Sequence, residues 1–394
     1  MRAYLDCNAT TQPAPEVIAA IGQVLSSNWG NPSSVHRAGI EARAAVDSAR
    51  ENIAALVGAR SVREIVLLSG GTESVNLAIR GSLAAQPSRR VVVSSPLEHS
   101  AVRSTLAHLA KQGVESVWLP HAADGRVELD ALESLLRSRG SEIALVSLMW
   151  ANNELGHFQP VADAAALCRS HGVRFHTDAT AAVGKEPCDF AAAGVDMASF
   201  CAHKLHGPTG VGALYMRRDV RIEPGQTGGH HERERRAGTE NVPGIIGFGV
   251  AAQLAGEWLA SDGPAQSQAR HERLEAALLA RCSGVRIHLQ GQPRLWSTTS
   301  AVFPRLAGDA ILIALSERGV AASAGSACLS GSVEPSPVVL ALGVDQDTAR
   351  ATVRFSISRQ TTDAEIDFAV EQVAAVVAQM QRAMAALALG AAMG

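Results

Sequence analysis

Short apolar runs alternate with longer stretches of helical spacing through the middle of the chain. The runs that we expect to form strands lie at residues 65–68, 91–94, 143–149, 173–177, 197–200 and 211–215. Between them, residues 128–137 and 161–169 carry apolar side chains at helical spacing. Strands that alternate with helices are typical of a mostly parallel sheet, and continuous apolar runs indicate strands covered on both faces. The pattern therefore predicts an α/β fold.

Helices are also predicted on either side of this alternating block. An amphipathic pattern spans residues 40–56 and stops at Gly58, and an apolar helical pattern spans residues 244–259. The polar residues 261–266 contain Gly-Pro and mark a boundary, beyond which helical patterns recur at 270–281 and from Asp363. The predicted parts are an N-terminal segment (1–15) that packs with a smaller C-terminal α+β domain (261–394), and a large α/β domain (16–260).

Composition excludes several classes of protein. The 394 residues are 47% apolar and 19% charged, which provides a large core and excludes wholesale disorder. A net charge of -3 and 4% aromatic residues argue against a nucleic-acid-binding protein. No apolar run reaches the roughly 18 residues of a membrane helix, and the N-terminus is not a signal peptide. The six cysteines form no C-x-x-C pair, which is typical of reduced thiols in a cytoplasmic protein, and we predict no metal site.

Five of the predicted strands end in polar or reactive residues. These strand ends are Ser69-Gly70-Gly71-Thr72, Glu98-His99, Asn152-Asn153-Glu154, Asp178 and His203-Lys204. In a doubly wound sheet, ligands bind beyond the carboxyl ends of the strands. Because packing alone does not explain five polar ends on one sheet edge, we predict a shared binding site there.

Three of these strand ends fit the parts of one cofactor. Glycines around Gly71 let backbone N–H groups approach a phosphate at a helix N-terminus, although a tight turn with a Ser/Thr cap explains them equally well. Lys204 is either a solvated lysine or, if recessed beside apolar walls, an amine that forms a Schiff base. Asp178 is either a helix cap or the partner of a ring nitrogen. A phosphate cup, a lysine and a carboxylate together predict a site for pyridoxal 5′-phosphate.

Motifs that extend from about Tyr4 to Ile366 then identify a family. They are Tyr-Leu-Asp-Cys-Asn-Ala-Thr-Thr (4–11), Gly-Asn-Pro-Ser-Ser-Val-His (30–36), Ser-Gly-Gly-Thr-Glu-Ser (69–74), Glu98-His99, Met-Trp-Ala-Asn-Asn-Glu (149–154), His-Thr-Asp-Ala (176–179), His203-Lys204, Arg-Arg-Ala-Gly-Thr-Glu-Asn (235–241), Gly-Ser-Ala-Cys (325–328) and Val-Arg-Phe-Ser (353–356). With these motifs the chain resembles the fold-type I, class V aminotransferase superfamily. Within it, the chain is most similar to the cysteine desulfurases that supply sulfur for iron–sulfur clusters.

The resemblance implies how the cofactor is held. Lys204 would carry it as an internal aldimine, Asp178 would pair with the ring nitrogen, and His99 would stack on the ring and help to move protons. Taken alone, a histidine at a strand end is more often structural. The residues implied to contact the phosphate or the phenolic oxygen are Gly71, Thr72, Cys201, His203, Asn153 and, from a second subunit, Thr239.

The resemblance also implies the substrate and the nucleophile. Asn8, Asn153 and Arg354 would bind L-cysteine, with Arg354 gripping its carboxylate in a bidentate fork that lysine cannot reproduce. Without the resemblance, Arg354 would be interpreted as an ordinary ion-pair residue, and Cys328 in its Ala/Ser-rich segment as an inert thiol. With it, the Cys328 thiolate attacks the sulfur of cysteine, leaving alanine and an enzyme persulfide. The implied partners are a second copy of the chain and a sulfur-acceptor protein such as an iron–sulfur scaffold.

Some positions depart from the family pattern and leave alternatives open. Ala181 stands where a glutamine usually donates to the cofactor, and Cys201 stands where a serine usually binds the phosphate. The other departures are Cys7, His231, Glu234 and Pro337. One alternative is therefore a selenocysteine lyase or another β-lyase or aminotransferase that uses the same cofactor. A second is a non-catalytic scaffold in a sulfur-transfer complex, against which the intact Lys204, Asp178 and Cys328 argue.

Overall fold

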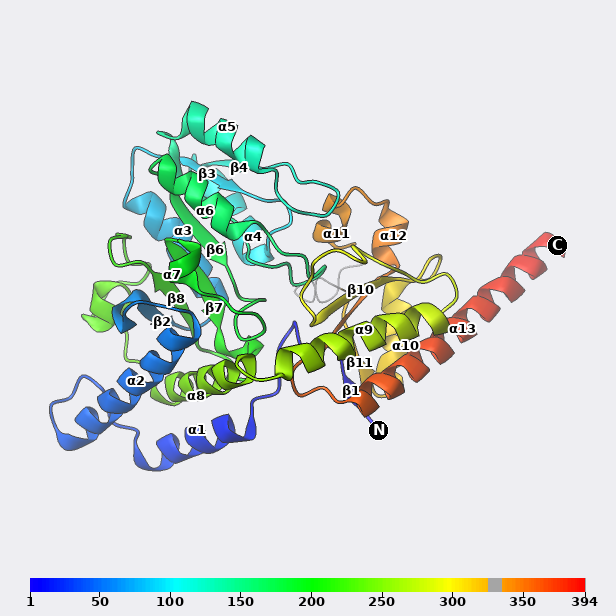
Figure 1. The fold of residues 1–394 in the computed structure, drawn as a ribbon, viewed down its shortest axis with the longest axis horizontal. Helices are drawn as coiled ribbons and strands as arrows, with labels where there is room; N and C mark the ends of the chain where they lie inside the picture. The colour runs from blue at the N-terminus through cyan, green and yellow to red at the C-terminus, as the bar shows by residue number, and fades with distance from the viewer. Residues whose placement is uncertain (325–334, 394) are drawn as a thin grey trace. The chain divides into compact units, whose positions relative to one another are not determined.

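The computed structural model describes residues 1–324 and 335–393 (Figure 1). The chain forms two compact units. The larger unit comprises Thr11–Asn152 and Phe158–Ser261. The smaller unit comprises Met1–Thr10, Asn153–His157 and the described part of Asp262–Gly394. Two short segments that are distant in the sequence thus fold with the C-terminal part of the chain.

The core of the larger unit is a seven-stranded sheet with the strand order β2-β8-β7-β6-β5-β3-β4. In chain order the strands are β2 (Ile65–Leu68), β3 (Val91–Ser94), β4 (Glu115–Trp118), β5 (Ile143–Ser147), β6 (Arg174–Asp178), β7 (Met197–Cys201) and β8 (Gly212–Met216). Strands β4, β3, β5, β6 and β7 are parallel, whereas β8 is antiparallel to both of its neighbours. The predicted α/β fold with a mostly parallel sheet is confirmed.

Six of these seven strands coincide with the apolar runs in the sequence. Every residue of β2, β3, β5, β7 and β8 is buried, as expected for strands covered on both faces. The pattern misses β4, whose residues lie at the sheet edge and are exposed or half-buried. An edge strand needs no continuous apolar run, because one of its sides is open to solvent.

The helices of the larger unit connect and cover these strands (Figure 1). They are α1 (Pro15–Ser27), α2 (Arg37–Leu56), α3 (Gly71–Ala84), α4 (Ser100–Ala110), α5 (Leu129–Arg139), α6 (Val161–Ser170), α7 (Phe190–Ala193) and α8 (Val242–Leu259), with short 3-10 helices η1 (Val62–Glu64), η2 (Ala202–Lys204) and η3 (His231–Glu234). The helices predicted at 40–56, 128–137, 161–169 and 244–259 are confirmed to within three residues at each end. Helix α3 packs on β7 and β8 and contributes Leu77 and Ile79 to the core.

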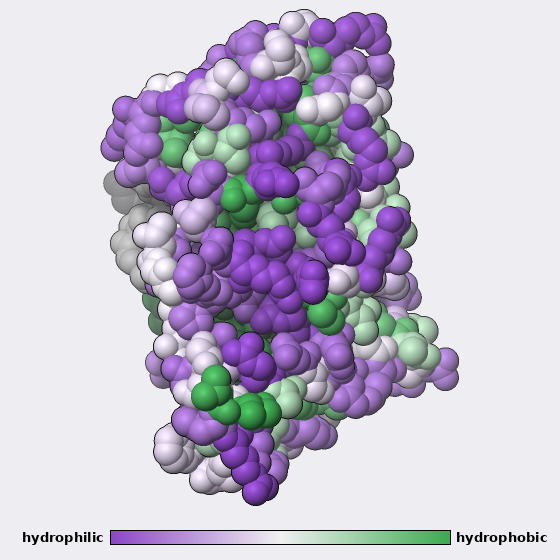
Figure 2. Space-filling model, turned by 90° about the vertical axis from the view of Figure 1, so that its left-hand side faces the viewer, coloured by the Kyte–Doolittle hydropathy of each residue, from purple (hydrophilic) through white to green (hydrophobic). Residues whose placement is uncertain are grey.

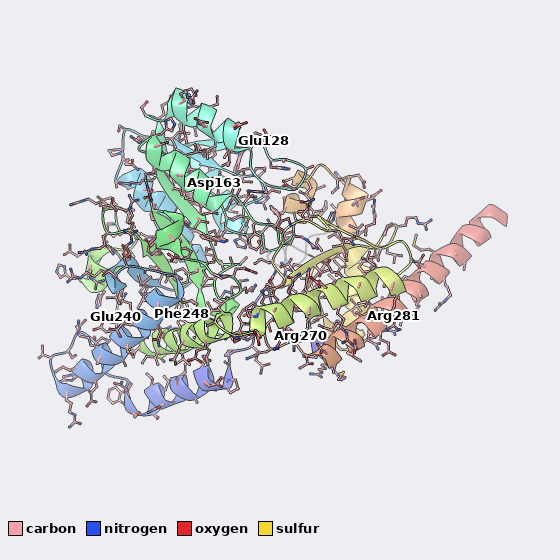
Figure 3. All side chains as sticks on the ribbon, in the orientation of Figure 1. Glu128, Asp163, Glu240, Phe248, Arg270 and Arg281 are labelled. Atoms are coloured by element: carbon pink, nitrogen blue, oxygen red, sulfur yellow. The ribbon has the colours of Figure 1, made fainter. Side chains whose placement is uncertain are left out.

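Helix α8 is apolar because it lies in the core. By length and composition alone it could cross a membrane, and it is the one such helix among the residues described. Half of it is buried, however, and it packs against α1 and α2. Its Phe248 is fully buried and meets Phe200 of β7 edge-on, with ring centroids 5.8 Å apart (Figure 3). These contacts are those of a core helix in a folded domain.

The smaller unit combines short sheets with helices. Its strands are β1 (Ala3–Tyr4), β9 (Arg286–Ile287), β10 (Thr298–Val302), β11 (Val320–Ala321) and β12 (Thr352–Ser356), and its helices are α9 (Gly263–Arg281), α10 (Gly308–Glu317), α11 (Pro337–Ala341), α12 (Gln346–Arg350) and α13 (Asp363–Met393). Antiparallel β12-β10-β9 form one sheet, and β1 pairs with β11 in parallel. Helices α9 and α13 lie side by side, joined by an ion pair between Arg270 and Asp363 (Figure 3).

A buried ion pair holds the loop that precedes α8. Arg50 of α2 donates to both carboxylate oxygens of Glu232, at 2.8 and 2.6 Å, and Glu232 also accepts the Leu67 N–H of β2 at 2.9 Å. Glu232, Arg233 and Glu234 have φ values of 46°, 57° and 66°, which are unfavourable for residues with a side chain. Glycine would adopt the left-handed φ at position 234 without this strain. The ion pair therefore fixes a strained segment to α2 and β2.

Replacing Arg50 by leucine should reduce the free energy of unfolding by about 3–5 kcal/mol, because Glu232 would remain buried without its partner charge. Thermal or urea denaturation measures the loss. Arg37→Leu on the same helix is the matched control, since it breaks only the exposed pair with Glu41 and should leave stability nearly unchanged. Equal effects of the two substitutions would contradict this role of the buried pair.

Candidate active site

The first predicted site residues lie where β2 leads into α3. Gly71 and Thr72 are the first two residues of this 14-residue helix, so their N–H groups belong to its positively polarised end. A Cβ built on Gly71 would lie 3.1 Å from Thr180 Oγ1 and 3.9 Å from Cys201 Sγ. The backbone therefore approaches these side chains closely. Together, the helix N-terminus and the hydroxyl-bearing side chains form a cup of donors suited to a phosphate group.

Glu73 and Arg236 hold this turn in place. Glu73 accepts the Ser69 N–H at 2.6 Å and pairs with Arg236 Nε at 3.0 Å. Burial alone would raise the pKa of Glu73, but the hydrogen bonds from Ser69 and Arg236 outweigh it and lower the pKa overall. Because Arg236 belongs to the loop that carries Thr239, this ion pair joins the loop to the phosphate cup.

Cys201 completes the cup from the end of β7. The backbone N–H groups of Gly71 and Lys204 are directed at its sulfur. Burial raises the pKa of the Cys201 thiol to about 11, although the Lys204 charge acts in the opposite direction. The neutral thiol is a weaker hydrogen-bond donor than a serine hydroxyl. We therefore expect this contact to a phosphate to be weaker than the one that the family's serine makes.

His203 and Lys204 lie in η2, directly after β7, and both are half-buried. The His203 carbonyl accepts the N–H and the hydroxyl of Thr11, at 2.9 and 2.8 Å, which fixes the backbone beside Lys204. Burial, together with the charges of Lys204 and Lys185, lowers the pKa of His203 to about 4. The His203 ring is therefore neutral at pH 7 and can offer one N–H donor.

Asp178 is the last residue of β6, and His99 is the residue that precedes α4. Asp178 is 6% exposed, and its carboxylate accepts the Thr180 N–H at 3.0 Å. His99 caps α4, because its Nδ1 accepts the Ala101 N–H at 3.1 Å. This hydrogen bond assigns the proton of the neutral ring to Nε2. His99 thus has a structural role as the cap of α4, with its ring proton on Nε2.

Glu98 is a buried carboxyl to which the motif analysis gives no role. It is fully buried, its Oε1 accepts the Met149 N–H at 2.6 Å, and its Oε2 has no hydrogen-bond partner within the described residues. Burial raises the pKa of Glu98 well above its ordinary value, and the Asp178 charge raises it further. While Glu98 is protonated it adds no negative charge beside Asp178. The signal in the sequence was its place at a strand end, next to His99.

A buried hydrogen-bonded chain lies among the strands that carry these residues. His176 of β6 contacts Ser147 Oγ through Nδ1 and Ser199 Oγ through Nε2, each at 2.8 Å. The Ser74 hydroxyl of α3 lies 2.7 Å from the same Ser199 oxygen. Burial lowers the pKa of His176 to about 4, so the ring is neutral. This chain ties β5, β6, β7 and α3 together and fixes the strand ends in register.

Thr239 lies on the loop between η3 and α8 and is exposed. It lines a cavity of about 140 Å³ with Ser69 of the cup turn and Arg236. It also lines a larger cavity of about 660 Å³ with Arg50 and His231. Its predicted action on a second subunit stays a prediction, because one chain is described.

The three predicted substrate-binding residues meet in the smaller unit. Arg354 of β12 is 1% exposed and donates to the main-chain oxygen of Asn153 at 3.1 Å. The Asn8 amide donates to the same oxygen at 2.9 Å and to Thr298 Oγ1 at 2.7 Å. Arg354 also pairs with Asp6, 2.8 Å away, which the motif analysis left without a role. Arg354 thus forms an ion pair, as the alternative interpretation of the sequence expected, and its binding of a substrate carboxylate stays a prediction.

The segment that carries Asn153 is itself held by a second ion pair. The Leu295 N–H donates to the Gly156 carbonyl at 2.8 Å, and the neighbouring Arg294 forks onto Glu275 of α9 at 3.0 and 2.9 Å. Burial alone would raise the pKa of Glu275, but the hydrogen bonds from His271 and Arg294 lower it to about 2. Position 153 is therefore fixed by α9 through Arg294.

The structure thus gathers the predicted residues into two groups. Gly71, Thr72, His99, Asp178, Cys201, His203 and Lys204 lie at strand ends in the larger unit, and Asn8, Asn153 and Arg354 lie in the smaller unit. Cys328 falls outside the described residues. Ala181 is buried, and its methyl group supplies no hydrogen-bond donor.

Comparison with known proteins gives concordant results. The family model of class-V aminotransferases matches residues 3–368. The cysteine desulfurase NifS of Azotobacter vinelandii is 43% identical over 96% of this chain and 93% of its own length. A solved NifS-like protein is 33% identical with a TM-score of 0.88, covering 96% of this chain and all of that one. SspA, solved in complex with cysteine, is 30% identical with a TM-score of 0.79 over 91% of this chain and all of its own.

Glu98→Gln should have a higher melting temperature than the native chain, and this difference should grow as the pH rises from 5 to 8. A carboxyl with a raised pKa in the folded state stabilises below its unfolded pKa and loses that contribution as the pH rises. The difference can grow by up to about 1.4 kcal/mol per pH unit. Exposed Glu128→Gln is the control and should show no such trend (Figure 3). A pH-independent difference for Glu98→Gln would refute a raised pKa.

Proposed function

The chain belongs to the class-V aminotransferase family and within it to the cysteine desulfurases, and from this premise we propose which of its residues release sulfur from L-cysteine. It has the fold-type I architecture of its solved relatives. The observation that carries the assignment is 43% identity to a cysteine desulfurase over nearly the whole chain. The placement of Lys204, Asp178 and His99 at the ends of parallel strands of one sheet supports it.

The residues of the larger unit fit pyridoxal 5′-phosphate. The close approach of the Gly71 backbone to Thr180, which a Cβ would crowd, leaves a donor cup at the N-terminus of α3 for the phosphate. The neutral ring of His203 adds a donor, and the Asp178 carboxylate would bind the ring nitrogen. Lys204 Nζ would hold the cofactor covalently. When bound, the cofactor supplies an electron sink that makes the α-proton of an amino acid acidic.

The chain's own residues then orient the substrate and carry its sulfur. The Arg354 guanidinium binds the carboxylate of cysteine, with Asn8 and Asn153 holding the arginine in position. His99 Nε2 serves as the proton-carrying atom. The Cys328 thiolate attacks the sulfur of cysteine, forming an S–S bond while the C–S bond of the substrate breaks. Sulfur stays on the enzyme as a persulfide, and the remaining carbon skeleton leaves as alanine after it takes up a proton.

A second copy of the chain and a sulfur acceptor complete the proposal. Apolar side chains are more than half exposed on and beside α1 and α2: Ile18, Leu25, Trp29, Val35 and Ile40. Figure 2 shows a largely hydrophilic face with separate hydrophobic patches. Exposed apolar groups of this kind favour a homodimer, in which exposed Thr239 would reach the partner's cofactor.

The acceptor we propose is an iron–sulfur scaffold protein in the cytoplasm, where persulfides and free thiols persist.

Lys204→Ala should abolish covalent attachment of the cofactor. In the native protein, borohydride reduction followed by peptide mapping should find a pyridoxyl group on Lys204 alone, and in the variant on no lysine. Lys185→Met is the matched control, because Lys185 is buried and its charge, like that of Lys204, acts on His203. That control should keep the label on Lys204. A pyridoxyl group on Lys185 or any other lysine would overturn the assignment.

Cys328→Ser should keep the absorbance of the bound cofactor and its change on adding cysteine, yet lose the persulfide. Alanine formation should fall by about two orders of magnitude or more, because a serine hydroxyl is far less acidic and less nucleophilic toward sulfur. Cys282→Ser is the control, since burial raises the pKa of the Cys282 thiol to about 11 and keeps it unreactive. Full persulfide formation in Cys328→Ser would point to another nucleophile. An unchanged rate without any persulfide would favour a selenocysteine lyase or another β-lyase.

A further inference from the structure

Arg354 is held by the carboxylate of Asp6, to which the sequence motifs assign no role. Its guanidinium NH2 lies 2.8 Å from Asp6 Oδ1, while its NH1 donates to the Asn153 carbonyl at 3.1 Å. The Arg354 side chain is 2% exposed, and the Asp6 side chain is 20% exposed. A carboxylate therefore already lies against the group to which the substrate carboxylate would bind.

Backbone pairing holds the main chain of Asp6 beside β12. The Ser356 N–H donates to the Leu5 carbonyl at 2.7 Å, and the Cys7 N–H donates to the Ser356 carbonyl at 3.0 Å. Asn8 N–H donates to the Ser356 hydroxyl at 2.9 Å. Asp6 is thus fixed as a strand neighbour of Ser356, two residues beyond Arg354.

The backbone of Arg354 is also paired, with Ser323. Its N–H donates to the Ser323 carbonyl at 2.7 Å, and the Ser323 N–H donates back to the Arg354 carbonyl at 3.1 Å. With both backbones paired, the contacts with Asp6 Oδ1 and with the main-chain oxygen of Asn153 orient the guanidinium plane.

We propose that Asp6 is a positioning residue that sets the affinity of Arg354 for the α-carboxylate of the substrate. This inference rests on the proposed function, in which Arg354 binds that carboxylate. Asp6 acts in two opposing ways. Its oxygen orients the guanidinium, which strengthens binding, and its negative charge repels an incoming carboxylate, which weakens binding. The balance lets the enzyme bind cysteine and still release alanine, which carries the same carboxylate.

Two substitutions separate the two effects in the cofactor-loaded protein. Asp6→Asn keeps an oxygen that can accept from Arg354 but removes the charge, so L-alanine should bind about tenfold more tightly. Asp6→Ala removes the orienting oxygen as well, so L-alanine should bind about tenfold more weakly. Calorimetric titration measures both. Alaninamide, which has no carboxylate, is the matched ligand and should bind all three proteins equally.

Steady-state kinetics provides a second readout that a purely structural role would not reproduce. The KM for cysteine should fall in Asp6→Asn and rise in Asp6→Ala while cofactor content stays close to native. Both substitutions remove the partner charge of the buried Arg354 and should lower the melting temperature, so stability alone would move KM in the same direction in both. Unchanged alanine binding in both variants would overturn the proposal, and equal tightening in both would overturn the orienting role. Arg354→Ala distinguishes failure of the underlying function: if alanine binding survives that change, Arg354 does not bind the carboxylate, whatever the Asp6 variants do.

Discussion

Parallel strands that are buried on both faces can display polar chemistry only at their ends, and this constraint positions the residues that we propose to bind the cofactor. The ends of β2, β3, β6 and β7 carry the glycine turn, the Glu98-His99 pair, Asp178 and the Cys201–Lys204 segment. Because β2 and β7 are both antiparallel to β8 between them, they share one direction, and their ends meet at the same edge. The buried chain from Ser147 through His176 to Ser199 keeps β5, β6 and β7 in register.

Buried arginine–carboxylate pairs then fix the segments that the sheet does not reach. Arg50 holds the strained turn at Glu232, Arg294 holds the segment of Asn153 through Glu275, and Asp6 holds Arg354. Such pairs give little net stability, because desolvation of the charges offsets their attraction. Their contribution here is one defined geometry for loops whose residues are proposed to contact phosphate or substrate.

The sequence predicted the sheet well because its strands are continuous apolar runs, and it missed β4, whose residues are exposed. It also placed the candidate residues at strand ends, since a parallel topology brings those ends together. It gave no role to Glu98, Thr180 or Asp6, because their importance comes from contacts with Met149, Gly71 and Arg354, which lie in other elements. The membership of Asn153 in the smaller unit likewise depends on pairing with residues far along the chain, which a local pattern does not contain.

The central claim is that this chain moves sulfur from cysteine onto its own thiol, and one measurement tests it most directly. The cofactor-loaded native protein is mixed with L-cysteine in the absence of any acceptor or reductant, and alanine and protein-bound persulfide are quantified in the same samples. The account predicts an initial phase in which both appear in equal amounts, roughly one per subunit, before turnover slows. Alanine without persulfide, or a keto acid in place of alanine, would contradict it.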